Sequence, residues 1–327
     1  MRGKSPQQFH CRAAAILLGR PALLSSLAAM SAASDFRRFE IPGVATFAVG
    51  PGDLPRLCIR TAQAQAELFL RGAHVTHFQP AGAQPVIFVS QRSLFEPGKA
   101  IRGGVPICFP WFGPRAGHPE SPMHGFARTR AWELESLQSS AERGVTIALR
   151  LASDESTRAL WPHDFAARFV VEITAHLTMT LEVENTSGSS FQFESALHTY
   201  FAVSDVRHVS VTGLENAAYI DKTDAFARKQ LGPEPLRFTA ETDRVFPGAT
   251  GACVIHDPGL NRNIVVEKSG SATTVVWNPW IAKAAAMADF GDDEWARMLC
   301  IETANTGDDA ITLASGAKHA LTQTVRP

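Results

Sequence analysis

Apolar and polar residues alternate in short runs from Phe36 onward, and glycine, proline and asparagine separate the runs. An alternation with a period of two places every second side chain on one face, which is typical of a half-buried β-strand. Residues 167–174 and 178–184 predict two neighbouring antiparallel strands. We count about fifteen or more strand candidates in all. The others are 39–41, 44–49, 56–60, 66–70, 72–78, 86–89, 132–135, 145–151, 191–203, 209–211, 264–267, 273–277, 298–302 and 311–313.

Helical patterns are rare in the chain. Only residues 156–161 and 224–229 have the spacing of short helices. No linker, change of composition or fixed-period repeat divides residues 36–327. The pattern therefore predicts an all-β fold, a large sandwich of antiparallel strands in a single domain.

Residues 1–35 differ from the remainder. They are rich in basic residues and have no acidic residue before Asp35, and Arg20 interrupts their apolar run. An export signal needs an apolar region of about 7–15 residues without an arginine. We therefore expect a leader or disordered tail, or a true translation start at Met30, in preference to a signal or transit peptide.

Charge and cysteine content exclude several classes of protein. Lys plus Arg number 31 and Asp plus Glu number 32, so no net charge recruits nucleic acid or an anionic membrane. No segment has the ~18 uninterrupted apolar residues that a membrane span needs. The cysteines are widely spaced without a Cys-x-x-Cys pair, which favours a reducing, cytoplasmic compartment over a disulfide scaffold or zinc site. They are Cys11, Cys58, Cys108, Cys253 and Cys300.

The stretch 101–113 is the first candidate for a binding loop. Arg102 is followed by two glycines, and glycine lets the backbone approach a ligand closely. Phe109, Trp111 and Phe112 offer flat apolar faces on which a sugar ring could stack, as in many small-molecule pockets. The alternative is a loop whose aromatic residues are buried in the core.

Two ionisable residues lie inside apolar strand candidates. Glu302 ends an apolar run, so its carboxylate must be paired, be hydrogen-bonded or have a raised pKa. His198 lies between Leu197 and Thr199, where it is either a core histidine or a functional one. Either could belong to an active site, because perturbed groups gather there.

His124 is a third candidate, in a loop four residues before Arg128. No His-x-His or His-x-x-x-His spacing links His124 to His198, so a metal site is not expected. Trp277 and Trp280 add two aromatic residues beside a predicted turn.

Eight motifs occur in consistent order between about Phe36 and Val325. They are RGGVPI from Arg102, FPWFG from Phe109, HGFAR from His124, LWPHD from Leu160, ALHTYF from Ala196, ETD from Glu241, WNPW from Trp277 and CIE from Cys300. Together they resemble the glucose-6-phosphate 1-epimerase family of the aldose 1-epimerase, or galactose mutarotase, superfamily. Residues 1–35 have no counterpart in this resemblance.

The resemblance implies a galactose-mutarotase-like β-supersandwich that interconverts the α and β anomers of a hexose 6-phosphate. It implies that His198 is the general acid that protonates the ring oxygen and that Glu302 is the base that takes the proton of the C1 hydroxyl. It further implies no metal or organic cofactor, and we expect a monomer. The residues implied in sugar binding are Arg102, His124, Asp243 and, as a weaker assignment, Arg128.

Two rival functions remain open at this point. The same sandwich could be a carbohydrate-binding or sugar-sensing protein without turnover, because a fold does not dictate a function. A glycoside hydrolase would need two carboxylates about 5–10 Å apart. The carboxylates that precede Glu302, which are Asp289, Asp292 and Asp293, have the pattern of a solvated loop.

Overall fold

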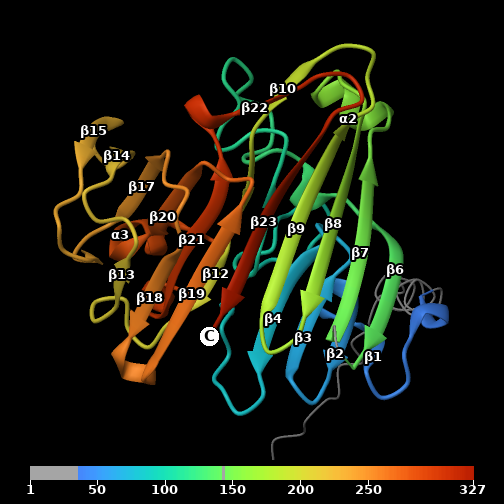
Figure 1. The fold of residues 1–327 in the computed structure, drawn as a ribbon, viewed down its shortest axis with the longest axis horizontal. Helices are drawn as coiled ribbons and strands as arrows, with labels where there is room; N and C mark the ends of the chain where they lie inside the picture. Colours follow the sequence, from blue (N-terminus) through green and yellow to red (C-terminus); the bar gives the residue numbers. More distant parts are fainter. Residues whose placement is uncertain (1–35, 142–143) are drawn as a thin grey trace, which may run out of the picture.

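Antiparallel β-sheets make up most of the computed structural model, which describes residues 36–141 and 144–327 (Figure 1). The prediction of an all-β sandwich is confirmed. The leader predicted at residues 1–35 lies outside the described residues.

The largest sheet has nine strands and extends from β18 on the left of Figure 1 to β6 on the right. Its order is β16-β13-β18-β19-β23-β9-β8-β7-β6. The bounds are β6 Glu133–Ser140, β7 Gly144–Ala152, β8 Phe165–Ile173, β9 Leu177–Asn185, β13 Ser210–Thr212, β16 Leu236–Arg237, β18 Cys253–Asp257, β19 Arg262–Ser269 and β23 Lys318–Arg326.

A second sheet of eight strands has the order β15-β14-β17-β20-β21-β11-β5, with β12 also paired to β21. The bounds are β5 Ile107–Cys108, β11 Ser195–Leu197, β12 Tyr200–Ala202, β14 Ala218–Asp221, β15 Ala227–Gln230, β17 Thr242–Pro247, β20 Thr273–Asn278 and β21 Met298–Asn305.

Two smaller sheets complete the strand structure. A four-stranded sheet contains β1 Ala45–Val49, β2 Pro55–Arg60, β3 Ala64–Phe69 and β4 His74–Pro80, and a pair contains β10 Phe191–Phe193 and β22 Ile311–Leu313. Helices are few and short. They are α2 Glu155–Leu160, α3 Trp280–Ala286 and the 3-10 helices Arg37–Phe39, Pro51–Asp53, Ala127–Thr129, Pro258–Leu260, Glu294–Arg297 and Gly307–Asp309. Within the described ranges, no helix has the length and apolarity to cross a membrane.

Strands β8 and β9 show why the alternation forms a sheet. Every second residue of each strand is buried, and the two strands pair antiparallel from Phe165 opposite Asn185 to Ile173 opposite Leu177. Their apolar faces join side chains of the four-stranded and eight-stranded sheets in one large hydrophobic cluster. The predicted pairing of residues 167–174 with 178–184 is therefore confirmed.

The eight-stranded sheet has two faces with different partners. On one face, Gln323 of β23 bonds to Thr199 and to Thr303 of β21, which fixes this face against the nine-stranded sheet. Successive side chains of a strand point to opposite faces, so Glu302 points away from that contact. A separate hydrophobic cluster lies on this outer face and consists of Cys108, Ala196, Val245, Val275 and Ala304.

The predicted strand at 191–203 is interrupted twice, so that it forms β10, β11 and β12. The first break is at Glu194, whose carboxylate bonds to other segments of the chain. The second is at His198 and Thr199, where the amide of Thr199 bonds back to the carbonyl of Leu197. Residues 86–89 form only isolated bridges at Ile87 and Val89, not a strand of their own.

The helix predicted at 156–161 is confirmed as α2, with Asp154 as the cap of its first turn. The helix predicted at 224–229 is wrong, because these residues form the turn between β14 and β15 and most of β15. Ala225 and Phe226 both have positive φ, at 47° and 61°, and this left-handed backbone cannot continue a right-handed helix.

Phe109 lies at the centre of the core, fully buried, with its ring in edge contact with four other rings. These belong to Phe126, Trp161, Phe165 and Phe193. The surrounding rings come from separate segments and cannot all close onto a shorter side chain, so truncation leaves a cavity.

We predict that Phe109→Ala lowers the free energy of unfolding by about 3–5 kcal/mol. Urea denaturation measures this loss. The matched control is Phe226→Ala, at an exposed turn, which should change it by less than about 0.5 kcal/mol. A loss for Phe109→Ala as small as that of the control would contradict this view of the core.

Candidate active site

A cavity of about 260 Å³ lies on the outer face of the eight-stranded sheet. Five of the six site residues predicted from the sequence line it, although they come from widely separated parts of the chain. The lining residues are Arg102, Phe112, Gly113, Pro114, Met123, His124, His198, Tyr200, Lys222, Asp243, Trp277, Lys283, Met287 and Glu302.

His198 and Glu302 meet at the bottom of this cavity. Nε2 of His198 lies 3.3 Å from Oε1 of Glu302, and the two side chains are only 9% and 1% exposed. Nδ1 of His198 and Oε2 of Glu302 are buried without a hydrogen-bond partner in the described part of the chain. Buried polar atoms are nearly always satisfied, so the pair has free capacity for a polar ligand.

Burial shifts the pKa values of Glu302 and His198 in opposite directions. It raises the pKa of Glu302 well above its usual value, and the charge of Asp243 acts in the same direction. It lowers the pKa of His198 well below its usual value, as do the charges of Arg128 and Arg102. Because a buried site disfavours charge, both shifts favour a protonated Glu302 beside a neutral imidazole in the free protein.

Arg102 is held in place by two partners at the cavity wall. Its guanidinium lies 3.1 Å from Asp289 and donates a hydrogen bond of 3.3 Å to the hydroxyl of Tyr200. Asp289, predicted to belong to a solvated loop, is thus part of the site's surroundings. This ion pair fixes the direction in which Arg102 presents its remaining N–H donors.

The glycines after Arg102 serve the backbone and not a ligand. Gly104 has a φ of 68°, and a Cβ there would lie 2.4 Å from Nε2 of His74 on β4. The same imidazole bonds to the carbonyl of Gly103 at 2.8 Å. The expected close approach exists, but it is an approach of the loop to β4, which sets the position of Arg102.

His124 adopts a left-handed backbone, with a φ of 63°, that turns its ring toward His198. The amide of Gly113 donates to Nδ1 of His124 at 3.2 Å, so the neutral ring carries its proton on Nε2. Burial and the charge of Arg128 lower the pKa of His124 well below its usual value. His124 is therefore a neutral hydrogen-bond donor at the cavity.

Asp243 and Lys222 form an ion pair across from Glu302. The ammonium of Lys222 lies 3.3 Å from Oδ1 of Asp243 and 5.5 Å from the centre of the Phe112 ring. Burial raises the pKa of Asp243, and Lys222 opposes that shift. The pair supplies both a hydrogen-bond acceptor and a donor to any ligand in the cavity.

Arg128 lies outside the set of residues that line the cavity. Its side chain is partly buried, and Nη2 donates to the carbonyl of Met123 at 2.8 Å. Its charge acts through the protein by lowering the pKa of His124 and His198. Direct contact of Arg128 with a sugar stays a prediction.

The aromatic residues of the 101–113 loop separate into two groups. Phe109 and Trp111 are buried in the core, so their predicted role as stacking faces is wrong. Phe112 lines the cavity, as does Trp277 from β20. Trp280 packs against Trp295, with ring centres 4.4 Å apart.

Glu194 connects three segments around the site. One carboxylate oxygen accepts from the amide of Phe112 at 2.8 Å, and the other accepts from Thr306 and Gly307 at 2.9 and 2.7 Å. Its own amide donates to the carbonyl of Pro110. Glu194 thus ties the Phe112 loop to the end of β21, the strand that carries Glu302.

Four polar residues at or beside the cavity were not identified as site residues from the sequence: Tyr200, Lys222, Lys283 and Asp289. Tyr200 lies two residues after His198 and could have been found, since an alternating strand places both on one face. The other three come from turns, a short helix and a loop, where no local pattern indicates which way a side chain points.

Comparisons with known proteins identify the family of this chain. A family model described as aldose 1-epimerase matches residues 55–326. The chain is 37% identical over 276 residues to a protein of Escherichia coli K12 named "Putative glucose-6-phosphate 1-epimerase", with 84% of this chain and 90% of that protein covered. A relative of the same name from Salmonella typhimurium is 39% identical over 253 residues, which cover 77% of this chain and 83% of the relative.

The solved structures show the same fold. A crystal structure of a "putative mutarotase (YeaD)" from Salmonella typhimurium superimposes with a TM-score of 0.82 at 34% identity, covering 88% of this chain and 94% of that one. The chain belongs to the aldose 1-epimerase family. It is an epimerase, and this membership favours catalysis over the sugar-binding alternative.

The state of the buried imidazole can be measured directly. We predict that His198 stays neutral as the pH falls through 6.5, its ordinary pKa, whereas it takes up a proton there in the urea-unfolded chain. The unfolded chain then binds a proton that the folded chain does not, so stability falls as the pH decreases below 6.5.

Nitrogen-15 NMR of labelled histidines, with the His198 signal assigned by its loss in His198→Asn, checks this prediction. Titration of His198 at or above pH 6.5 in the folded protein would contradict the described burial.

Proposed function

We propose that the protein is a glucose-6-phosphate 1-epimerase, which interconverts the α and β anomers of hexose 6-phosphates. The observation that carries the proposal is the buried contact of 3.3 Å between His198 and Glu302 in a cavity lined by cationic side chains. The names of the relatives at 37% and 39% identity support this substrate.

Ring opening requires two proton transfers at the anomeric centre. In the substrate complex the proton of Glu302 first passes to Nε2 of His198, across the contact of 3.3 Å. His198 as acid then gives a proton to O5 while the C1–O5 bond breaks, and Glu302 as base takes the proton of the C1 hydroxyl. The products are the open-chain aldehyde, a neutral imidazole and a protonated carboxyl group. Rotation about C1–C2 then presents the other face, and the reverse transfers close the ring to the other anomer.

The pKa shifts fit this cycle. The pair contains one proton before and after ring opening, first on His198 and then on Glu302. Burial raises the pKa of Glu302 and lowers that of His198, so it favours the neutral pair that accompanies the open chain. The site thereby lowers the free energy of the intermediate relative to the charged pair and the closed ring.

The remaining polar groups match the substrate. Neutral His124, Asp243 and Arg102 offer donors and acceptors to the sugar hydroxyls. Arg102, Lys222 and Lys283 place three cations along the cavity, to which a phosphate can bind. It would share them with their carboxylate partners, which are Asp289, Asp243 and Glu241. We further infer a reducing, cytoplasmic location, which the buried free thiols of Cys108, Cys253 and Cys300 support.

The test is the rate at which the protein equilibrates freshly dissolved α-glucose 6-phosphate, followed by polarimetry beside α-glucose and α-galactose. We expect the phosphate to be the preferred substrate. Acceleration of the free sugars alone would contradict the proposed substrate and indicate a general aldose mutarotase.

We predict that Glu302→Gln lowers kcat for glucose 6-phosphate by about 10²–10⁴-fold, the usual contribution of a positioned acid or base. KM should change little, because the amide keeps the shape of the carboxyl group. The matched control is Glu133→Gln, an exposed carboxylate of β6, which should retain full activity. Full activity of Glu302→Gln would remove this residue from the mechanism.

A further inference from the structure

A polar cavity of about 360 Å³ lies on the nine-stranded sheet. It shares no lining residue with the cavity that contains His198 and Glu302. Its walls come from β13, β16, β18 and β19, three of which are labelled on the left of Figure 1. Nothing in the proposed reaction uses this cavity.

Four side chains at the cavity form one row across the sheet. Ser210 of β13 lies opposite Arg237 of β16 on one side and opposite His256 of β18 on the other. His256 in turn lies opposite Asn263 of β19. A neighbour of each of these residues along its strand is buried in the core: Val211, Leu236, Ile255 and Ile264. Because successive side chains alternate between faces, the row points away from the core and into the cavity.

Ser210 is the buried member of this row. It is only 8% exposed, and its hydroxyl makes no hydrogen bond to any residue that the structure describes. Buried polar groups are nearly always bonded. Since Ser210 lines the cavity, a ligand there can supply the missing hydrogen bond.

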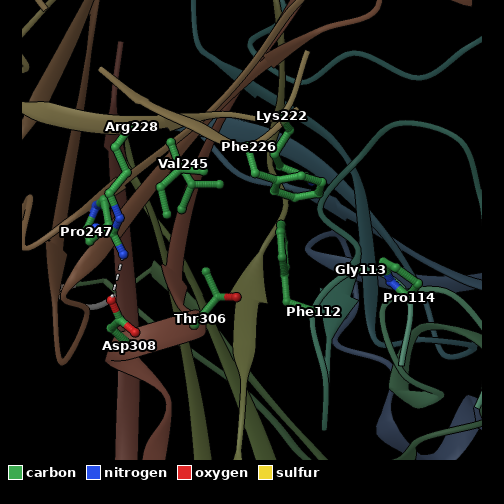
Figure 2. A pocket seen from close by; sticks show the side chains of 12 residues that line it. Phe112, Gly113, Pro114, Lys222, Phe226, Arg228, Val245, Pro247, Thr306 and Asp308 are labelled. Atoms are coloured by element: carbon green, nitrogen blue, oxygen red, sulfur yellow. Dashed lines mark hydrogen bonds and ion pairs between the residues drawn. The ribbon is translucent and has the colours of Figure 1, made fainter. Parts of the chain in front are cut away.

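Arg237 is an exposed cation without a carboxylate partner in the described part of the chain. The cavity that adjoins the active site differs in this respect, because its Arg228 lies 3.3 Å from Asp308 (Figure 2). An anion that binds Arg237 therefore displaces no carboxylate of the protein.

His256 and Asn263 add hydrogen-bonding capacity to the row. Nδ1 of His256 contacts Oδ1 of Asn263, and Nε2 contacts the hydroxyl of Thr212, both at 2.9 Å. An amide oxygen only accepts, so Nδ1 carries the proton of this contact. The amide nitrogen of Asn263 is then free to donate to a ligand. His208, whose side chain is 73% exposed, lines the same cavity with a second imidazole.

Asp257 is the acidic residue that lines this cavity, and its carboxylate is already satisfied. Its side chain is fully buried and accepts from the amide and hydroxyl of Ser204 and from the amide of Leu260. The guanidinium of Arg262 lies 3.9 Å from it and offsets its charge. The charge of Arg237 is therefore left uncompensated, and the cavity favours an anion.

The donors reach the cavity from several strands. Ser210, Arg237 and Asn263 belong to three strands of one sheet, and neighbouring strands lie about 4.8 Å apart. A planar carboxylate offers its two oxygens in one plane, whereas a phosphoryl group offers three in a tetrahedral arrangement. Arginine also binds phosphate through two parallel hydrogen bonds. Donors that come from different directions thus match a phosphoryl group better than a carboxylate.

We propose that this cavity is a second ligand site, which binds a phosphoryl group as free phosphate or as the phosphate ester of a sugar. Arg237 pairs with the phosphoryl oxygens, and the hydroxyl of Ser210 and the amide of Asn263 donate to them. The site acts independently of the proposed chemistry at His198 and Glu302.

Nitrogen-15 NMR of labelled histidines, titrated with sodium phosphate at constant pH and ionic strength, tests this proposal. The signals of His208 and His256 are assigned by their loss in His208→Asn and His256→Asn. We expect both signals to shift in a saturable way with inorganic phosphate. Sodium chloride and glucose should leave them unchanged.

Substitutions in the row should weaken this binding. Arg237→Gln should raise Kd for inorganic phosphate about tenfold or more, because it removes a charge-assisted pair of hydrogen bonds. Ser210→Ala should raise it to a smaller extent. The matched control is Arg150→Gln, which removes the same charge from an exposed position on β7 and should leave Kd unchanged.

The absence of a saturable shift, or an equal Kd in Arg237→Gln and the unmodified protein, would overturn the proposal. Either relative affinity identifies the source of the phosphoryl group. Tighter binding of glucose 6-phosphate at His208 indicates a sugar phosphate, and tighter binding of inorganic phosphate indicates the free ion. Because the readout is a histidine signal and not turnover, the result does not depend on the proposed function.

Discussion

The burial of an acid and a base in contact with each other is the constraint on which the site depends. Charging both His198 and Glu302 there costs much solvation, so in the free protein burial favours the neutral form of the pair. The same burial suits the proposed anomerisation, in which the pair exchanges one proton with the sugar and loses none over the cycle. The desolvation of His198 and Glu302 thus affects both the stability of the folded chain and the proposed proton transfer.

The fold supplies this burial through the two faces of one sheet. β21 places Thr303 against the nine-stranded sheet, where Gln323 satisfies it, and Glu302 on the outer face, where loops cover it. Hydrogen bonds fix those loops. His74 bonds to the Arg102 segment, and Glu194 bonds to the Phe112 segment. The cavity is therefore built by strands and loops together, with Glu302 on β21 and His198 at the break between β11 and β12.

The sequence predicts those parts of the structure that local patterns determine. The alternation identifies β8 and β9, and the position of an acid within an apolar strand marks Glu302 as a candidate, which the structure places in a cavity. Lys222 and Asp289 could not be found in this way, because turns and loops from distant segments bring them to the site. The incorrect helix at 224–229 has the same origin, since helical spacing does not reveal a left-handed turn.

The central claim is that His198 and Glu302 act as one proton-sharing unit, and a double-mutant cycle tests it most directly. The kcat for glucose 6-phosphate is measured for His198→Asn, Glu302→Gln and the double variant, with folding checked by circular dichroism. Residues that act as a unit are strongly non-additive, so the double variant should be no slower than the slower single variant. If the two losses multiply, the residues act independently and the account of a shared proton is wrong.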